Sequence, residues 1–408
     1  MDKITFCIPS KNNRRYLEAC IPSIRRNSFR DDHDIIVFVD ADNDGTVEWL
    51  ESVREKYNIN YTVNDSGSLY GIGKAYDHCI KESKTDIFMI FHADMMLGKN
   101  ADLEAFKYLG EGKVVCSTRI EPPLHPEGPE KIIENFGMWP EEDIEDGWKE
   151  KEFDKFVEDS KIKYKDKTTN GCFAPWMMYK KDFLKMGGHD PRFHSCREDS
   201  DVFNRCVLAE YDLIQSWESF VYHLTARAGQ FQHGKLTKDN SLKSKEWSDM
   251  MDASTREFYR KWGSIVLHDE YMLPIIAPKY DIAFVVKNCN YAHLHELEPW
   301  CSAIYVDYKS LMHPYVTAEQ DKTVDDLKEK VKFISENQKI DNDVIVEFDC
   351  KYLNINKIEF ITKLGFILKE SAEIGDMEFD IFKLKIKSLK TYEKELIGGV
   401  YSKKKGSK

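Results

Sequence analysis

Two residues of metal-ligand type follow a short apolar run in the first quarter of the chain. The sequence MIFHADMM at 89–96 places His92 and Asp94 one residue apart, directly after the apolar run 87–91. A continuous apolar run of this length predicts a strand buried on both faces, so both polar residues come where the strand leaves the core. Imidazole nitrogens and carboxylate oxygens are common ligands of divalent cations. The pair is therefore a candidate metal site, with a turn or a helix cap as the ordinary alternative.

Polar residues also follow two earlier predicted strands. The first strand, in KITFCIPS, ends in Pro9 and Ser10, and the second, DIIVFVD, runs into VDADNDGT with Asp40 and Asp42. Each group alone is explained by a turn or a helix cap. In an open parallel sheet, however, ligands bind outside the carboxyl ends of the strands. Three such groups at one edge therefore predict a binding site there.

Strands and helices alternate through the first hundred residues. Strands are predicted at 3–10, 34–40, 59–63 and 86–91, and helices with an apolar stripe at 16–26, 46–57 and 71–83. This order predicts an α/β fold with a mostly parallel, Rossmann-like sheet flanked by helices. Residues from about 122 to 168 are Pro-rich and then acidic and amphipathic. They are expected to form an insertion over the sheet rather than another sheet unit.

A second strand–helix series starts after the break LPIIAPKYD at 273–281. Its predicted strands are 281–286, 303–307, 343–348 and 378–389, and its predicted helices are 324–334 and one from Asn356, which forms a capping box with Glu359. The alternating lysines of FKLKIK predict that one face of the last strand meets solvent. We therefore expect two domains, residues 1–278 and a smaller α/β domain of open role at 279–408, which ends in the basic tail YSKKKGSK.

Composition excludes some classes of protein and partner. Lys and Arg number 59 against 71 Asp and Glu, a net charge of −12, which argues against nucleic acid as a partner. The chain contains no run of about 18 apolar residues, and MDKITFCIPS has no apolar signal region, so we expect no membrane span and a cytoplasmic location. None of the ten cysteines forms a CxxC pair, so a zinc knuckle is not expected.

The stretch GSLYGIGKA at 67–75 contains glycines but matches no phosphate-binding motif. A P-loop requires glycine where Ser68 stands and Ser or Thr where Ala75 stands. The pair Gly71 and Gly73 lacks the third glycine of a dinucleotide fingerprint. Both phosphate-binding interpretations are therefore rejected.

Taken together, the motifs resemble those of a known family. FCIPSKNN, VDADNDGT and FHADMM look like the three N-terminal motifs of family 2 glycosyltransferases, which have the GT-A fold. GGHDPRFHSCREDSDVFNRCVLAEYDL at 187–213 is similar to the most specific stretch of that family. There a glycine pair precedes an acidic pair, here Glu198 and Asp199, and a helix with Asp201 and Arg205. The resemblance covers residues from about 1 to 230.

The resemblance implies a donor site with a divalent cation, Mn²⁺ or Mg²⁺. Asp94 matches the family's metal-binding aspartate, which holds the cation against the diphosphate of a nucleotide sugar. His92 stands in place of the first aspartate of that motif, and whether it binds the metal, contacts the donor or only packs stays open. His223, in SFVYHLTARAG, is the candidate that would complete the metal site.

The resemblance also implies how the donor would be held. Asp40 would contact the nucleobase, with Asp42 as the nearby alternative, and Pro9 and Ser10 would line the same pocket through their backbone. The family's A-x-N-x-G pattern is altered, with Asp77 in place of the asparagine. The donor sugar and base therefore stay open, and a UDP-sugar is favoured.

For the reaction itself, Asp199 matches the family's catalytic base, and Glu198 beside it is the second candidate. One carboxylate is enough to take the proton of an acceptor hydroxyl in a single displacement, which inverts the anomeric carbon. A plain helix N-cap is the alternative for the same position. Trp139 and Trp176 are candidates for stacking on an acceptor sugar, with ordinary packing as their alternative. The loop 226–240 is a candidate cover for the diphosphate.

The expected function is metal-dependent transfer of a sugar from a nucleoside diphosphate sugar to a hydroxyl of a glycan, lipid or protein. The alternative is a catalytically weak sugar-nucleotide or glycan-binding protein of the same fold, because His92 and Asp77 depart from the motifs. The acidic pair at 198–199 favours catalysis. A sugar nucleotidylyltransferase would need a glycine-rich loop after the first strand, and PSKNNRRY contains no glycine.

Overall fold

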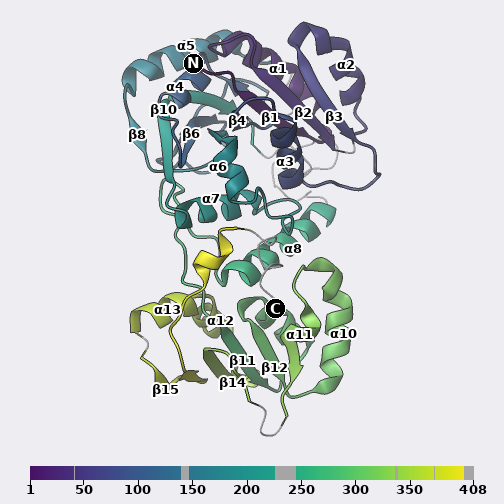
Figure 1. The fold of residues 1–408 in the computed structure, drawn as a ribbon, viewed down its shortest axis with the longest axis vertical. Coiled ribbons are helices and arrows are strands. Elements are labelled where there is room, and N and C mark those ends of the chain that lie inside the picture. Colours follow the sequence, from purple (N-terminus) through teal and green to yellow (C-terminus); the bar gives the residue numbers. More distant parts are fainter. Residues whose placement is uncertain (41, 139–146, 226–244, 336–338, 372, 399–408) are drawn as a thin grey trace. The chain divides into compact units, whose positions relative to one another are not determined.

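A computed structural model describes the chain except residues 41, 139–146, 226–244, 336–338, 372 and 399–408 (Figure 1). The described chain divides into two compact units. The first is formed mainly by residues 1–250 with 268–274, and the second by 251–267 with 275–397. Among the described residues, no helix has both the length and the hydrophobicity that crossing a membrane requires.

The first half of the large sheet is the predicted parallel α/β structure. Its strands run in the order β3 (Ile59–Asn64), β2 (Asp34–Asp40), β1 (Thr5–Ser10) and β4 (Ile87–Ile90), all parallel. The connecting helices are α1 (Arg14–Asn27), α2 (Thr46–Tyr57) and α3 (Ile72–Glu82). The apolar strands form the centre of the core, since β1, β2 and β4 are almost entirely buried. The α/β fold class is therefore confirmed.

The second half of the sheet is mixed in direction. From β4 the order continues through β9 (Trp176–Tyr179), β6 (Lys113–Glu121), β10 (Asp212–His223) and β5 (Met95–Leu97). β9 is antiparallel to both of its neighbours, whereas β10 runs parallel to β6 and antiparallel to β5. β5 follows β4 after only four residues of the chain, 91–94, and pairs with β10 at the other end of the strand order.

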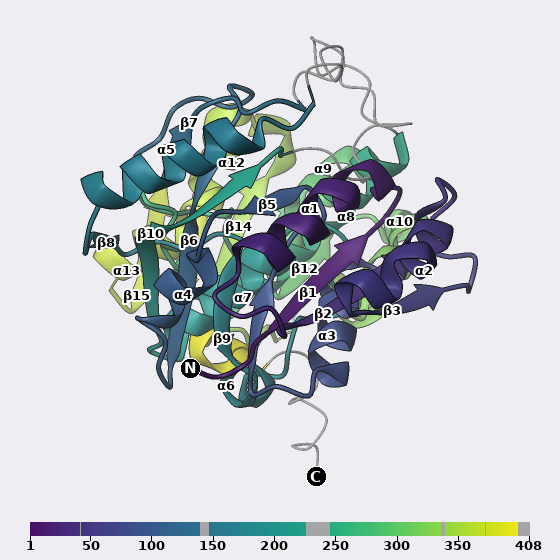
Figure 2. The same ribbon diagram turned by 90° about the horizontal axis from the view of Figure 1, so that it is seen from above.

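The predicted insertion is partly built into the sheet. β7 (Lys131–Ile133) pairs with β6, and β8 (Thr168–Thr169) pairs with β10, so these short strands extend the sheet instead of lying over it. Between them in the chain, α5 (Glu150–Lys163) lies beside β10, as Figure 2 shows. Its buried Phe153 and Val157 belong to one apolar cluster with Phe220 and Tyr222 of β10. The sequence predicted an insertion over the sheet rather than another sheet unit, and it gave no sign of these two short pairings, because runs of two or three residues are too short to show a strand period.

The second unit has its own sheet, in the order β13 (Val331–Phe333), β12 (Ala303–Val306), β11 (Ile282–Lys287), β14 (Val344–Asp349), β16 (Phe382–Ile386) and β15 (Gly375–Phe379). The first four strands are parallel, and the last two form an antiparallel hairpin. Its α-helices beyond residue 275 are α9 (Tyr291–Leu297), α10 (Lys309–Glu319), α11 (Leu327–Lys330), α12 (Ile355–Thr362) and α13 (Leu364–Ser371). The predicted second α/β region is present, and the boundary at 278 stays a prediction.

Three details of the second unit differ from the sequence prediction. The helix predicted at 324–334 is the short α11 followed by β13, because a β-branched valine follows Lys330 and the chain extends there. α12 is capped by Asn354, whose side chain accepts from the backbone N–H of Lys357, and not by Asn356. The last predicted strand is the hairpin β15–β16, with buried and exposed residues alternating along β16 as expected.

The remaining helices are α4 (Ala101–Phe106), α6 (Lys180–Lys185), α7 (Glu198–Leu208) and α8 (Lys245–Trp262). The C-terminal half of α8 belongs to the second unit, where Arg260 forms a buried ion pair with Glu298 (Nη2 to Oε2, 2.6 Å). Lys330 joins the same carboxylate at 2.8 Å.

Candidate active site

The segment between β4 and β5 places His92 and Asp94 at the carboxyl edge of the sheet. The backbone N–H of Met95 donates to the carbonyl oxygen of His92 at 3.2 Å, so the two residues lie on a tight turn. The backbone of Asp94 is fixed as well, because its carbonyl accepts from the N–H of Leu224 at 3.1 Å. Asp94 is only 6% exposed. The predicted position at the exit of a buried strand is therefore confirmed.

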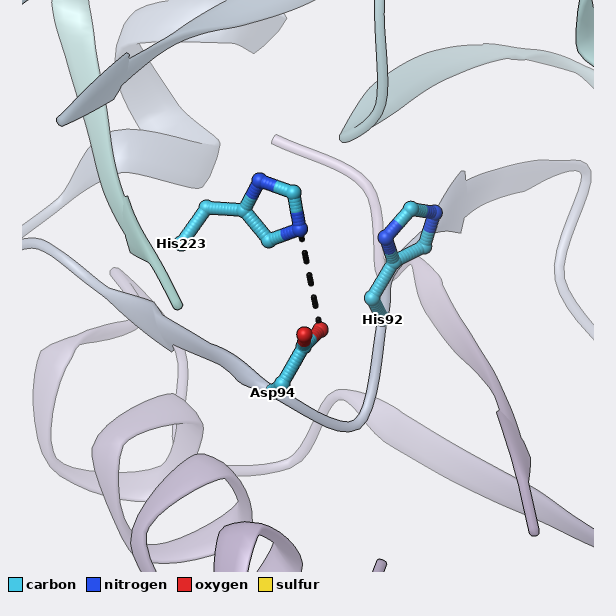
Figure 3. A group of neighbouring side chains, drawn as sticks. All are labelled: His92, Asp94 and His223. Carbon is cyan, nitrogen blue, oxygen red and sulfur yellow. Dashed lines mark ion pairs between the residues drawn. The ribbon is translucent and has the colours of Figure 1, made fainter. Parts of the chain in front are cut away.

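The register between β10 and β5 places His223, the last residue of β10, beside this turn although it lies about 130 residues later in the chain. In the antiparallel pair β10–β5, His223 lies opposite Met95, the residue after Asp94. Its Nε2 atom lies 3.7 Å from Oδ1 of Asp94. The rings of His92 and His223 meet edge to face at 5.4 Å between centroids. Figure 3 shows the three side chains pointing toward one another.

These three side chains form a donor set that fits a divalent cation. One potential ligand atom from each residue lies within 4.8 Å of the others. Burial, reinforced by the nearby His223, lowers the pKa of His92 to about 4, so the ring is neutral at pH 7 and its nitrogen lone pair is free to bind a metal. Two imidazoles and one carboxylate suit Mn²⁺ better than Mg²⁺, which prefers oxygen ligands.

A buried charge cluster lies behind His223, and the sequence prediction missed it. Glu121, at the end of β6, accepts from Nδ1 of His223 at 3.0 Å and from Arg119 at 2.8 Å, and Lys131 contributes a third contact at 3.1 Å. Burial acts to raise the pKa of Glu121, but His223 and the two cations hold it well below its usual range. The available signal was an arginine and a glutamate two residues apart, hence on one face, in the apolar strand KVVCSTRIE.

The ends of β1 and β2 are joined through Asp42. Its carboxylate accepts from the backbone N–H of Asn12 at 2.6 Å and from the hydroxyl of Ser10 at 3.3 Å. Burial raises the pKa of Asp42 to about 6 against these hydrogen bonds. Pro9 lies beside Ser10 in β1 and is partly exposed at the same edge. The predicted neighbourhood of Pro9, Ser10 and Asp42 is present, and their contact with a donor stays a prediction.

Asp40, the residue predicted to meet a nucleobase, holds the loop that leads into α3. Its carboxylate accepts from the backbone N–H groups of Tyr70 and Gly71, at 3.0 and 3.2 Å, and from the side chain of Asn64 at 2.6 Å. Asp40 is 8% exposed. The residue therefore shapes the edge of the candidate pocket, whichever group binds there.

The acidic pair lies at the first turn of α7, as the sequence predicted for Asp199. Glu198 is buried, and this burial together with Asp199 raises its pKa to about 8. Glu198 is therefore protonated at pH 7 and has no basic lone pair to offer, which argues against its role as the second candidate base. Asp199 is partly exposed, and its Oδ1 accepts from the N–H of Ser200 at 2.6 Å.

The next acidic residue of the motif has a structural role. Asp201 forms a buried ion pair with Arg205 one turn later, at 2.8 Å. The same guanidinium donates to the carbonyl oxygens of Met186 and Gly188, at 2.9 and 2.7 Å. Arg205 thus fixes α7 against the glycine turn that precedes it, and through α7 it fixes the acidic pair.

The glycines of GSLYGIGKA allow close packing. A Cβ atom on Gly71 would lie 2.8 Å from the carbonyl oxygen of His194, and one on Gly73 would lie 3.0 Å from Cβ of His189. A Cβ atom on Gly188 would lie 2.6 Å from a carboxylate oxygen of Asp77. The start of α3 and the segment before α7 therefore pack closely, which accounts for these glycines without a phosphate.

Asp77 and Tyr76 join the two parts of the site. Asp77 accepts from Nδ1 of His189 at 2.7 Å, so the residue that departs from the family pattern is a packing partner of the α7 segment. Tyr76 is buried and stacks on His189, with ring centroids 5.7 Å apart, and its ring lies 6.4 Å from that of His92. The metal-ligand cluster and the start of α7 are thus connected through α3.

The predicted acceptor contact at Trp176 is corrected by the structure. Trp176 lies in β9 with 2% exposure and packs against the rings of Phe88, Phe183 and Phe203. A ring enclosed in the core offers no face to a sugar, so its role is packing. Trp139 and the loop 226–240, predicted to contact the acceptor and to cover the diphosphate, lie outside the described residues.

Comparison with known proteins gives a family match in the first unit. Residues 5–186 match the family model described as glycosyl transferase family 2, which is somewhat less than half of the chain. An abequosyltransferase from Salmonella typhimurium is 29% identical over 99 residues, which are 24% of this chain and 30% of the relative. The chain thus spans less than a third of that curated relative in the alignment.

Solved glycosyltransferase structures also align with the chain. GalNAc-T7 with UDP, GalNAc and Mn²⁺ aligns at 11% identity and a TM-score of 0.43, over 64% of this chain and 50% of the other. A mannosyltransferase from Pyrobaculum calidifontis in complex with GDP-Man and Mn²⁺ aligns at 15% identity and a TM-score of 0.39, over 56% and 58%. The family model confirms the resemblance over residues 5–186, which contain the three N-terminal motifs and carry a glycosyl transferase family 2 match, whereas the acidic stretch at 187–213 lies beyond the match and its resemblance stays a prediction.

Proposed function

We propose that this protein is a metal-dependent, inverting glycosyltransferase. It would transfer a sugar from a nucleoside diphosphate sugar, with UDP-sugars favoured, to a hydroxyl group of a glycan, lipid or protein. The observation that carries the proposal is the cluster of His92, Asp94 and His223 at the carboxyl edge of the sheet. A diphosphate bound at such an edge needs a cation or cationic side chains to balance its charge, and this cluster can hold the cation.

In this proposal one group of residues holds the cation, and another residue accepts the proton of the acceptor. His92, Asp94 and His223 hold a Mn²⁺ or Mg²⁺ ion, which when bound stabilises negative charge on the leaving diphosphate. Asp199 takes the proton of the acceptor hydroxyl while that oxygen forms the new bond to the anomeric carbon. A single displacement of this kind needs one basic carboxylate and inverts the anomeric configuration. The protonated Glu198 beside Asp199 leaves the pair with one basic member.

The alternative function is a sugar-nucleotide or glycan-binding protein with weak or no catalysis. It is favoured by Asp77, which stands where the family has an asparagine and is hydrogen-bonded to His189. It is disfavoured by the partly exposed carboxylate of Asp199, because binding alone requires no base.

The direct test is a screen of nucleoside diphosphate sugars for metal-dependent release of the nucleoside diphosphate. Released diphosphate would be measured with Mn²⁺, with Mg²⁺ and after treatment with a chelator. The transferase proposal expects release from at least one donor with Mn²⁺, and none after chelation. Binding of a donor without any turnover, with or without acceptors, would favour the alternative.

A further inference from the structure

The two ring nitrogens of His223 face two different carboxylates. Nε2 lies 3.7 Å from Oδ1 of Asp94, inside the candidate metal site. Nδ1 lies 3.0 Å from Oε1 of Glu121, which is 1% exposed. One side of the ring is therefore directed into the site, and the other side is held by a buried partner.

This arrangement follows from the sheet. β6 and β10 are parallel neighbours, and Tyr222 is in register with Ile120. Glu121 and His223 are the next residues of the two strands. Side chains at matching positions of adjacent strands project to the same face, so the backbone places this pair side by side.

The surroundings keep Glu121 ionised and acceptor-only. Arg119 donates to Oε1 at 2.8 Å, and Lys131 donates to Oε2 at 3.1 Å. Glu130 also pairs with Arg119, at 3.4 Å, so the two carboxylates balance the charges of Arg119 and Lys131. Because an ionised carboxylate has no proton to donate, Nδ1 of His223 must carry the hydrogen of the contact. A ring that carries its single hydrogen on Nδ1 has its lone pair on Nε2, which faces Asp94.

We propose that Glu121 is a positioning residue that fixes the orientation and tautomer of His223 so that Nε2 binds the catalytic cation. This inference rests on the metal dependence of the proposed function. A carboxylate behind a metal-binding histidine both orients the ring and makes the ligand nitrogen more basic, and its loss typically lowers metal affinity 10–100-fold. Glu121 itself is fully engaged by His223, Arg119 and Lys131 and supplies no ligand.

A purely structural role for the charge cluster is the competing explanation, and Glu130 provides the matched control. Both glutamates are paired with Arg119, and both lie near Lys131, but the contact with His223 belongs to Glu121. Glu121→Gln and Glu130→Gln each remove one negative charge from the cluster. In Glu121→Gln, the new amide N–H group finds an acceptor only in His223, since Arg119 and Lys131 are donors.

The first measurement is the tautomer of His223 in the metal-free protein, by long-range ¹H–¹⁵N NMR of the histidine-labelled full chain. The spectrum would be assigned with a His223→Asn variant. We expect the Nδ1–H tautomer in the wild type and in Glu130→Gln, and a shift toward Nε2–H in Glu121→Gln. A wild-type Nε2–H tautomer, or the same tautomer in all three proteins, would overturn the proposal.

The second measurement is the Mn²⁺ affinity of the same three proteins by calorimetry, after circular dichroism has shown that they are folded. We expect a 10–100-fold weaker affinity in Glu121→Gln and a change of less than about threefold in Glu130→Gln. Equal losses in both variants would assign Glu121 a structural role and overturn the proposal. If the wild type binds no Mn²⁺, the metal-dependent function fails, and the tautomer alone decides whether Glu121 fixes the ring.

Discussion

At the scale of single residues, the site is defined by which groups carry a proton. His92 is neutral and Glu198 is protonated at pH 7, in both cases because burial disfavours the charged form. Asp199 is partly exposed at the start of α7, where the partial positive charge of the helix end stabilises a carboxylate. The two adjacent acidic residues thus differ in burial and in proton binding, although the sequence presents them as a pair.

Replacing Asp199 with asparagine tests the assigned base. Asp199→Asn keeps the shape and the hydrogen bond to Ser200 but removes basicity. We expect transfer to fall by a factor of about a hundred or more, with donor affinity unchanged. Initial rates of transfer and calorimetric donor binding would measure the two effects. Transfer at a rate near that of the wild type would show that another group is the base.

The protonation of Glu198 predicts a pH dependence of stability. Its pKa rises from 4.5 to about 8 on folding, so the folded state holds a proton that the unfolded state releases. The resulting stabilisation is complete below about pH 4.5, declines above it and is lost as pH rises through about 8. Glu198→Gln should therefore lose less stability than the wild type between pH 5 and 8. The free energy of unfolding would be measured with urea at several pH values in this range. An equal decrease with pH in both proteins would show that Glu198 does not hold a buried proton.

At the scale of elements, α7 is held by one buried arginine. Arg205 pairs with Asp201 and caps two carbonyl oxygens of the preceding turn, all without solvent contact. Gly188 lets this turn approach α3 closely, because a Cβ atom there would lie 2.6 Å from a carboxylate oxygen of Asp77. Positioning of Asp199 therefore depends on residues that contact no substrate.

Arg205→Met should destabilise the protein strongly. Removal of one partner of a buried ion pair costs about 3–5 kcal/mol, because the remaining charge stays buried. Arg54→Met is the matched control, since Arg54 is an exposed helical arginine whose ion pair with Glu51 is long at 3.8 Å and contributes about 0–1 kcal/mol at most. Urea unfolding would compare them. A decrease of less than 1 kcal/mol in the free energy of unfolding of Arg205→Met would show that Arg205 does not hold α7 in place.

The sequence predicts elements better than it predicts partners. The strands at 34–40 and 59–63 and the helix at 46–57 are found nearly as expected, because their apolar periods are long and unbroken. The division of the predicted strand 378–389 into the hairpin β15–β16 and the short strands β7 and β8 were missed, since a few residues do not show in their sequence how strands pair. Glu121 was missed for the same reason: its importance comes from a strand register that the sequence does not display.

At the scale of the whole molecule, the described site residues all belong to the first unit. The second unit has a separate sheet and a separate core. The C-terminal half of α8 is bound to it through Arg260 and Glu298. We therefore expect a division of roles, with donor binding confined to the first unit.

The fragment 1–278 should still bind the donor. A cut at this point exposes Arg260 without Glu298, so the fragment is expected to be less stable than the full chain. Arg256 also pairs with Glu298, at 3.3 Å, so Arg256→Gln and Arg260→Gln in the same fragment would remove both positive charges that lose this partner. Calorimetric donor binding by either fragment would support the division. A soluble, folded fragment that does not bind the donor would show that the second unit contributes to the site.

The central claim is that His92, Asp94 and His223 hold a cation that binds a nucleoside diphosphate. The most direct measurement is calorimetric binding of UDP and GDP to the chelator-treated full chain, with and without Mn²⁺, in the wild type and in Asp94→Asn. We expect Mn²⁺ to strengthen wild-type binding of at least one nucleotide tenfold or more, about 1.4 kcal/mol, and Asp94→Asn to abolish this gain while remaining folded. Nucleotide binding that is equally tight without Mn²⁺, or a gain that survives in Asp94→Asn, would contradict it.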